Sequence, residues 1–154
     1  NVMTDTYVET NAVALLKADH AKVLNLFEHF EKADSSEDKR KLVDAICSEL
    51  KIHTLLEEEI FYPAFKAAHH DKSLIPEATV EHDTIRNLIS QIQGVEPVGE
   101  VFNARVKVLL EYVKHHVKEE HTDMFTDAKT AALDLNELGA QMIERKASLL
   151  DKKD

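Results

Sequence analysis

Four stretches of the chain place apolar residues at intervals of three and four, and this repeat limits the fold more than any other feature of the sequence. Ala, Leu, Glu and Lys are frequent, and only 3 Gly and 3 Pro occur among 154 residues, as expected of a mostly helical chain. Gly and Pro together mark the clearest break, at residues 94–99. The pattern predicts helices at about residues 8–33, 37–69, 76–93, 98–129 and 135–150.

Short connections between long helices favour antiparallel neighbours. We therefore expect an all-α fold, an up-down-up-down four-helix bundle with an additional short C-terminal helix. Residues 1–154 are expected to form one domain, with the bundle at about 8–130 and the extra helix at about 135–150. That last helix is expected to pack on the outside of the bundle or on a partner.

Polar side chains stand inside these stripes, where a core needs apolar ones. Glu57 follows His53 by four residues, and Glu120 follows His116 by the same interval, so each pair lies on one helix face. An unpaired buried carboxylate is costly, so it must be paired or bound to a cation. With the central His of the other two helices, the candidate metal ligands are His20, His53, Glu57, His82, His116 and Glu120.

Taken alone, each of these residues has an explanation that requires no metal. A single His on an apolar face is usually a hydrogen-bonded core residue, and one His-x-x-x-Glu sequence is often an exposed pair. Two such pairs together with a central His on both remaining helices favour a metal site, and this mixture of imidazole and carboxylate suits Fe, Mn or Zn. His115 and Glu119 form a competing pair one residue earlier, although His116 and Glu120 better continue the apolar stripe.

The residues around these positions resemble a known family. The runs 17–20, 53–63, 81–83 and 115–121, of which the second reads HTLLEEEIFYP, look like a hemerythrin-like (HHE cation-binding) domain over about residues 10–130. The resemblance implies a non-haem di-iron centre, with two Fe ions joined by an oxo or hydroxo bridge and by the carboxylates of Glu57 and Glu120. It also implies O2, peroxide or NO as the small-molecule ligand.

One departure from the O2-carrying members concerns the third helix, where His82 stands alone. Ala78 and Arg86 lie one turn away, and neither is a usual ligand. Four His, two bridging carboxylates and an oxygen bridge leave two coordination positions open on a pair of six-coordinate ions. We expect Ala78 to face the gap and Arg86 to reach solvent. The groups considered for the vacant position are Glu81, Tyr112, His115, Glu119 and His121.

Three functions are compatible with such a site. The first is a protein that binds iron and binds or senses O2, peroxide or NO. The second is an enzyme, a peroxide-consuming (catalase-like) di-iron oxidoreductase or an oxidase, which the missing His favours because metal catalysis needs free positions. The third is an iron-responsive interaction module that metal binding orders. The expected function is the first, a protein that binds iron and reacts with or senses O2, peroxide or NO, and the enzyme and the interaction module are alternatives, because the missing His shifts the balance only modestly.

Charge and cysteine content narrow the partners and the location. The formal charge of −10 disfavours nucleic acid and anionic membrane surfaces as partners. Cys47 is the one Cys, so no internal disulfide points to an oxidising compartment. No apolar run reaches the roughly 20 residues that span a bilayer, and no leader is recognised. The expected location is the cytoplasm.

Overall fold

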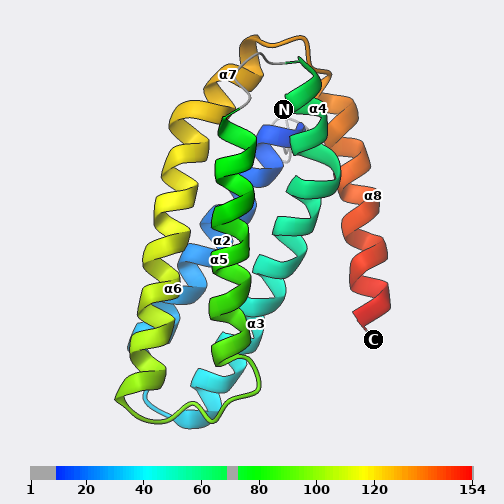
Figure 1. Cartoon of the computed structure of the whole chain (residues 1–154). Coiled ribbons are helices and arrows are strands. Elements are labelled where there is room, and N and C mark those ends of the chain that lie inside the picture. Colours follow the sequence, from blue (N-terminus) through cyan, green and yellow to red (C-terminus); the bar gives the residue numbers. More distant parts are fainter. Residues whose placement is uncertain (1–9, 69–72, 154) are drawn as a thin grey trace, which may run out of the picture.

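A computed structural model describes residues 10–68 and 73–153, and helices account for nearly all of them. Figure 1 shows long helical rods lying side by side, with the C-terminal helix beside them. Two of the rods run through a short π-helical segment without a break. In chain order the elements are α2 (Ala12–Lys32), α3 (Ser36–Leu56), η1 (Glu57–Phe61), α4 (Tyr62–Ala68), α5 (Leu74–Ile92), α6 (Glu100–Glu119), η2 (Glu120–Met124), α7 (Phe125–Thr130) and α8 (Leu135–Lys153).

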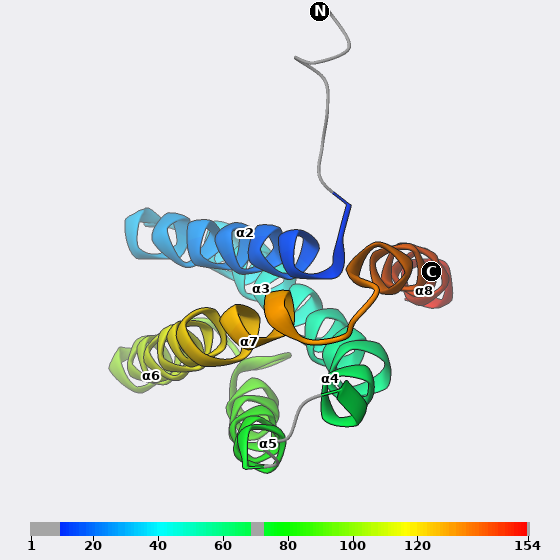
Figure 2. The ribbon, with the colours of Figure 1, turned by 90° about the horizontal axis from the view of Figure 1, so that it is seen from above.

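The bundle is the predicted one. Viewed from above, α2, α3, α5 and α6 surround a common centre, and α8 lies outside them (Figure 2). The second and fourth predicted helices correspond to α3–η1–α4 and α6–η2–α7. The helix α2 begins at Ala12, because the Asn11 side chain accepts a hydrogen bond from the amide of Ala14 and caps it, and the predicted start at residue 8 lies outside the described residues. The predicted end of the second helix at residue 69 lies outside the described residues.

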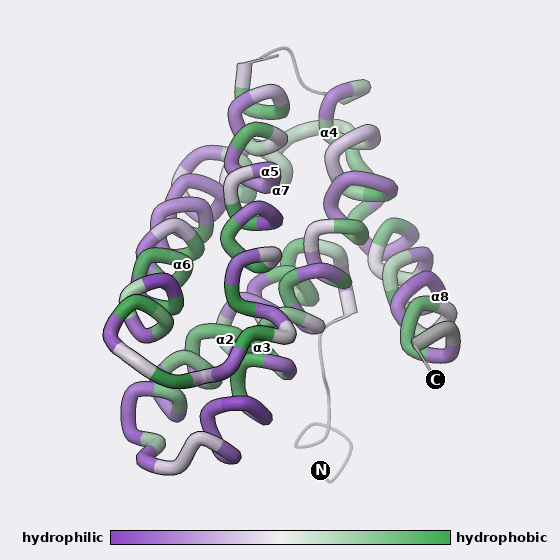
Figure 3. Tube along the Cα trace, turned by 60° about the horizontal axis from the view of Figure 1, so that its bottom comes forward, coloured by the Kyte–Doolittle hydropathy of each residue, from purple (hydrophilic) through white to green (hydrophobic). Residues whose placement is uncertain are grey.

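The apolar core is divided into two clusters. One cluster fills the end of the bundle near the connection between α5 and α6, and includes Val23, Phe27 and Leu109. The other fills the opposite end around α4 and α7, and includes Leu16, Phe61 and Phe125. Figure 3 shows hydrophobic and hydrophilic positions alternating along the helices. The predicted polar ligands occupy the level between the two clusters, because His20 follows Leu16 and precedes Val23 on α2.

The π-helical segments were not predicted. η1 begins at Glu57 and η2 begins at Glu120. In each, the amide five residues later, of Tyr62 or Phe125, donates to the carbonyl of the glutamate. A π turn inserts an extra residue into a helix and often marks a functional site. Each π turn therefore begins at one of the two glutamates that are predicted to bridge the metals.

The C-terminal helix α8 packs on the outside of the bundle against α2, α3 and η1. Gly139 makes this close approach possible, since a Cβ atom built there would lie 1.9 Å from the carbonyl oxygen of Thr10. Arg145 on α8 pairs with Glu59 of η1 at 2.8 Å. The expectation that this helix packs outside the bundle is therefore confirmed, and its partner is the bundle itself. In the part of the chain that the structure describes, no helix is long and apolar enough to cross a membrane.

Candidate metal centre

The structure brings all the predicted ligands together. Each of them is at most 5% exposed, and they come from the four long rods of the bundle. Glu57 and His82 are fully buried. The ligand-type atoms of the six predicted residues fall into two adjoining groups that share Glu57. One group is His20, His53, Glu57 and Glu120, and the other is Glu57, His82 and His116.

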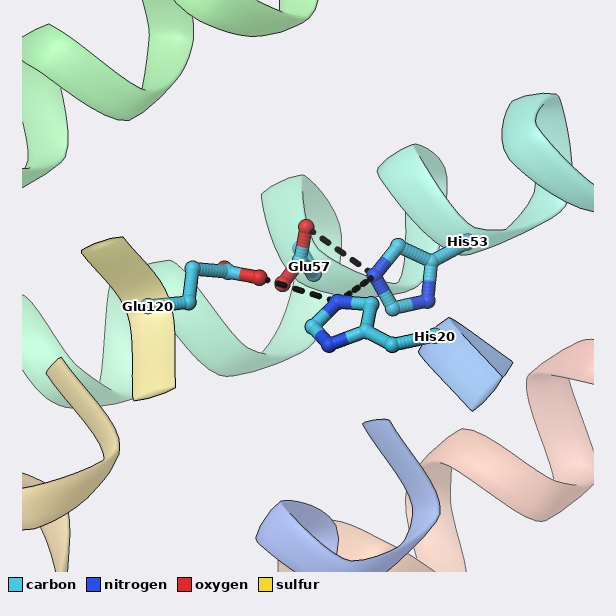
Figure 4. A group of neighbouring side chains, drawn as sticks. All are labelled: His20, His53, Glu57 and Glu120. Carbon is cyan, nitrogen blue, oxygen red and sulfur yellow. Dashed lines mark hydrogen bonds and ion pairs between the residues drawn. The ribbon is translucent and has the colours of Figure 1, made fainter. Parts of the chain in front are cut away.

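The first group is built around two imidazoles from α2 and α3. Nε2 of His20 lies 2.9 Å from Nε2 of His53. Glu120 Oε1 lies 3.1 Å from His20 Nε2, and Glu57 Oε1 lies 3.4 Å from His53 Nε2. Figure 4 shows these four side chains pointing at one another across the bundle.

The second group repeats this arrangement with imidazoles from α5 and α6. Nε2 of His82 lies 3.2 Å from Nε2 of His116. Glu57 Oε1 lies 2.9 Å from His82 Nε2 and 3.5 Å from His116 Nε2. Glu120 Oε1 is 3.3 Å from His116 Nε2, so each glutamate contacts imidazoles of both groups.

These spacings fit a pair of metal ions. An imidazole nitrogen binds a transition metal at about 2.0–2.1 Å, so two nitrogens at right angles around one ion stand about 3 Å apart. Both Nε2 pairs meet this spacing. Glu57 Oε2 is buried and has no hydrogen-bond partner among the described residues, and Glu120 Oε1 has only its ion-pair contacts with His20 and His116. A buried carboxylate oxygen without a donor is unfavourable, and a bound cation removes that cost.

The outer nitrogen of His53 is held by an acid. Its Nδ1–H donates to Asp19 Oδ2 at 3.1 Å, and Lys146 on α8 donates to the other oxygen of Asp19 at 3.2 Å. Burial alone would raise the pKa of Asp19, but the contacts with His53 and Lys146 outweigh it and lower the pKa. A charged Asp19 fixes the proton of His53 on Nδ1 and leaves Nε2 free for a metal, as outer partners of metal-bound His commonly do.

Two more ligand candidates are held by acids in the same way. Nδ1 of His82 donates to Glu58 Oε2 at 2.6 Å, and Arg86 donates to that same oxygen at 2.9 Å. Nδ1 of His116 donates to Glu81 Oε1 at 2.7 Å. Three of the four imidazoles therefore present Nε2 to the centre with the opposite nitrogen fixed by a carboxylate.

His20 has a different partner. Its Nδ1 lies 3.0 Å from Nε2 of His121, which stands on η2 at the edge of the site. Burial and the neighbouring His20 lower the pKa of His121. A neutral His121 accepts the hydrogen bond from Nδ1–H of His20, which again leaves His20 Nε2 for a metal.

Without a metal, protons balance the charge of the centre. Burial opposes a charged His53, but the carboxylate of Glu57 and the hydrogen bond with Asp19 raise the pKa of His53 to about 10. The same balance between burial and the charge of Glu120 raises the pKa of His116. Burial would raise the pKa of Glu57, and the charge of His53 instead holds it well below its usual range. Metal binding must displace these protons.

Tyr62 is the residue that the sequence-based prediction missed. Its hydroxyl donates to Glu120 Oε2 at 2.7 Å and lies 3.1 Å from Glu57 Oε1 and 3.3 Å from His82 Nε2. The ring stacks on His82, with the centroids 5.4 Å apart. In an α-helix a residue five positions after Glu57 points about 140° away from it. The π turn of η1 removes that difference and brings Tyr62 into the site.

The groups considered earlier for the vacant position do not occupy it. Tyr112 is 45% exposed, and the His115 and Glu119 side chains are 58% and 40% exposed. Arg86 is half-buried against Glu58 and Asp83 instead of facing the centre. Ala78 is buried, as expected, and borders a small pocket together with Glu120.

Together, the fold and the cluster define a metal-binding helical bundle. Residues 11–128 match the hemerythrin HHE cation-binding domain family, and the chain belongs to that family. The predicted resemblance is thus confirmed.

Two individual proteins are similar to the chain. A solved structure of a hemerythrin HHE cation-binding domain-containing protein from Mycobacterium kansasii is 27% identical, covers 90% of this chain and 86% of its own, and superposes with a TM-score of 0.76. A DNA nickase from Nostoc sp. is 26% identical over 117 residues, which are 76% of this chain. The chain spans 33% of the length of that relative.

Proposed function

We propose that the chain is a non-haem di-iron protein that reacts with or senses O2, peroxide or NO. The observation that carries this proposal is the convergence of four imidazoles in two pairs around two shared carboxylates. His20 and His53 would hold one ion, and His82 and His116 the other. Their spacing, and the acids that fix three of their outer nitrogens, are those expected of metal ligands.

We propose Glu57 and Glu120 as the bridging carboxylates. Each contacts imidazoles of both groups, and Glu57 also has a buried oxygen, Oε2, without a hydrogen-bond partner. Two carboxylates with four oxygens between them can span two ions. Iron is the metal favoured by the mixture of imidazole and carboxylate together with the family to which the chain belongs.

Tyr62 is proposed to supply the ligand that the missing His would provide. Its oxygen is close to both bridging carboxylates and to His82, so it lies on the side of the second ion. In the absence of metal, burial and the charges of Glu57 and Glu120 raise the pKa of Tyr62, and the hydroxyl acts as a donor. With Tyr62 as a ligand, a pair of six-coordinate ions would keep one position for a diatomic ligand or peroxide.

The position of the Tyr62 oxygen beside the bridging carboxylates also bears on which of the proposed functions is favoured. Bound iron supplies the electrons and the coordination position that O2, peroxide or NO chemistry needs. An anionic phenolate oxygen stabilises the ferric state relative to the ferrous state more than a neutral imidazole does. Reversible O2 carriage needs a long-lived ferrous state, so sensing or peroxide-consuming turnover fits Tyr62 better than carriage.

Metal analysis and rapid mixing test the proposal. Protein loaded with iron and freed of excess metal is expected to hold two Fe per chain, and a stoichiometry of one or zero would refute it. Stopped-flow mixing of the reduced protein with O2, and in a separate run with hydrogen peroxide, separates the branches. A persistent O2 adduct indicates carriage, whereas immediate oxidation together with consumption of the added peroxide indicates turnover. The name of the Nostoc relative refers to DNA, but the charge of −10 disfavours DNA as a partner, and its absence stays our expectation.

A further inference from the structure

A third group of ligand-type side chains lies outside the core. His115 and Glu119 stand on successive turns of α6, and Glu81 stands on the neighbouring helix α5. The two helices run side by side in both views of the bundle (Figures 1 and 2). Nε2 of His115 lies 3.0 Å from Glu119 Oε1 and 3.3 Å from Glu81 Oε2. One atom from each side chain lies within 4.8 Å of the others, which is close enough to share one ion.

Glu81 connects this group to the metal centre. Its Oε1 accepts the hydrogen bond from Nδ1 of His116, while its Oε2 faces His115. Its side chain is 18% exposed, whereas that of His115 is 58% exposed. The carboxylate therefore stands between a surface imidazole and a buried one. A pair that served only to solvate the helix surface would not need this inward contact.

A small pocket continues from the group toward the core. It has room of about 10 Å³, which holds roughly one water molecule or one ion. Glu120 of the metal centre, which is 2% exposed, lies in its wall. The described lining residues are Leu74, Glu77, Ala78, Glu81, Glu119, Glu120 and Met124.

The residues that line the pocket determine which ions can enter it. Four of its residues are carboxylates, and none of the described lining residues is Lys or Arg. Low-dielectric walls concentrate the field of such a group, which attracts cations and repels anions. Glu81 and Glu119 of the surface group and Glu120 of the core all line this pocket, so it adjoins both groups of ligand-type side chains.

We propose that Glu81, His115 and Glu119 form a surface metal site that takes up a divalent ion such as Fe²⁺ and passes it through this pocket to Glu120. One imidazole and two carboxylates suit Fe²⁺, Mn²⁺, Co²⁺ or Zn²⁺. The transfer to the core rests on the di-iron function proposed above, whereas the surface site itself does not.

The test uses two variants that alter no core ligand, His115→Gln and Glu119→Gln. Glu111→Gln is the matched control, because Glu111 is an exposed acid on the same helix. Calorimetric titration of the iron-loaded parent with Co²⁺ is expected to show one ion bound per chain in addition to the core iron. Both variants should bind this ion at least about tenfold more weakly, and Glu111→Gln should match the parent.

Loading kinetics test the transfer. Metal-free protein mixed with Fe²⁺ is expected to fill its core at least about tenfold more slowly in both variants, with an unchanged final iron content. A parent that binds no additional Co²⁺, or variants that bind it and load iron as the Glu111→Gln control does, would overturn the proposal. A core that takes up no iron at all refutes the di-iron function instead, and the difference in Co²⁺ binding between metal-free parent and metal-free His115→Gln variant still decides the surface site.

Discussion

Replacing Tyr62 by Phe tests two roles of the Tyr62 hydroxyl, that of a metal ligand and that of a hydrogen-bond donor to the buried carboxylates. The change keeps the ring that stacks on His82 and removes the hydroxyl that donates to Glu120 at 2.7 Å and lies 3.1 Å from Glu57. A hydrogen bond to a charged group contributes about 1.5–3 kcal/mol, and the loss here leaves another buried carboxylate oxygen without a donor. We expect the metal-free variant to be about 2–3 kcal/mol less stable than the parent.

The assay has one readout for each role. For a chain of this size, that loss lowers the melting temperature of the metal-free protein by about 4–12 °C. After iron loading, a phenolate bound to ferric iron absorbs visible light by charge transfer, and Tyr62→Phe should lose that absorption. Tyr112→Phe is the control, since Tyr112 is 45% exposed and should change neither readout. An iron-loaded Tyr62→Phe variant with the spectrum and iron content of the parent would show that Tyr62 is no ligand.

Four further predictions follow from named contacts. Glu57→Ala should lose both irons, because this carboxylate contacts imidazoles of both groups, and a variant that keeps both by metal analysis would contradict the bridging role. Asp19→Ala should weaken the binding of the ion held by His53 about 10–100-fold, because His53 loses the acid that fixes its outer nitrogen. A chelator should then remove one of the two irons faster than from the parent, and release of both irons at the parent rate would contradict this role of Asp19. Gly139→Ala places a Cβ 1.9 Å from a backbone oxygen of Thr10 and should cost about 1–3 kcal/mol in thermal unfolding, whereas an unchanged melting temperature would mean that α8 moves freely. The pKa of His53 is raised from 6.5 to about 10, so its contribution to the stability of the metal-free protein is complete below pH 6.5 and is lost as the pH rises through 10; a urea midpoint that did not fall over this range would refute the assignment.

The sequence was sufficient for the parts of the fold that rest on a periodic signal. Helical spacing of apolar residues located the helices, and polar interruptions of the same stripes picked out all six residues that converge in the core. The choice of His116 and Glu120 over the neighbouring pair followed from the stripe, and the structure buries the chosen pair and leaves His115 exposed. These features repeat along the chain, so a single sequence reveals them.

Features that depend on a local departure from the α-helix could not be predicted in this way. A regular helix puts Tyr62 and Glu57 on different faces, and only the π turn brings them together. The glutamate-rich run before Tyr62 carries no sign of that turn. The contact of Lys146 with Asp19 joins residues 127 positions apart, and it depends on where α8 packs. No periodicity encodes such a contact.

The spacing of the candidate ligands along the chain has a consequence for how long the fold persists. His20 and His53 are 33 residues apart, Glu57 and His82 are 25 apart, and His82 and His116 are 34 apart. If two ions were bound as proposed, their ligands would connect each rod of the bundle near its middle to the other three, much as cross-links would. No rod could then leave the bundle without breaking a bond to metal. The lifetime of the metal-bound bundle would be governed by the rate of metal release. The ends of the helices could unfold and refold many times within that lifetime.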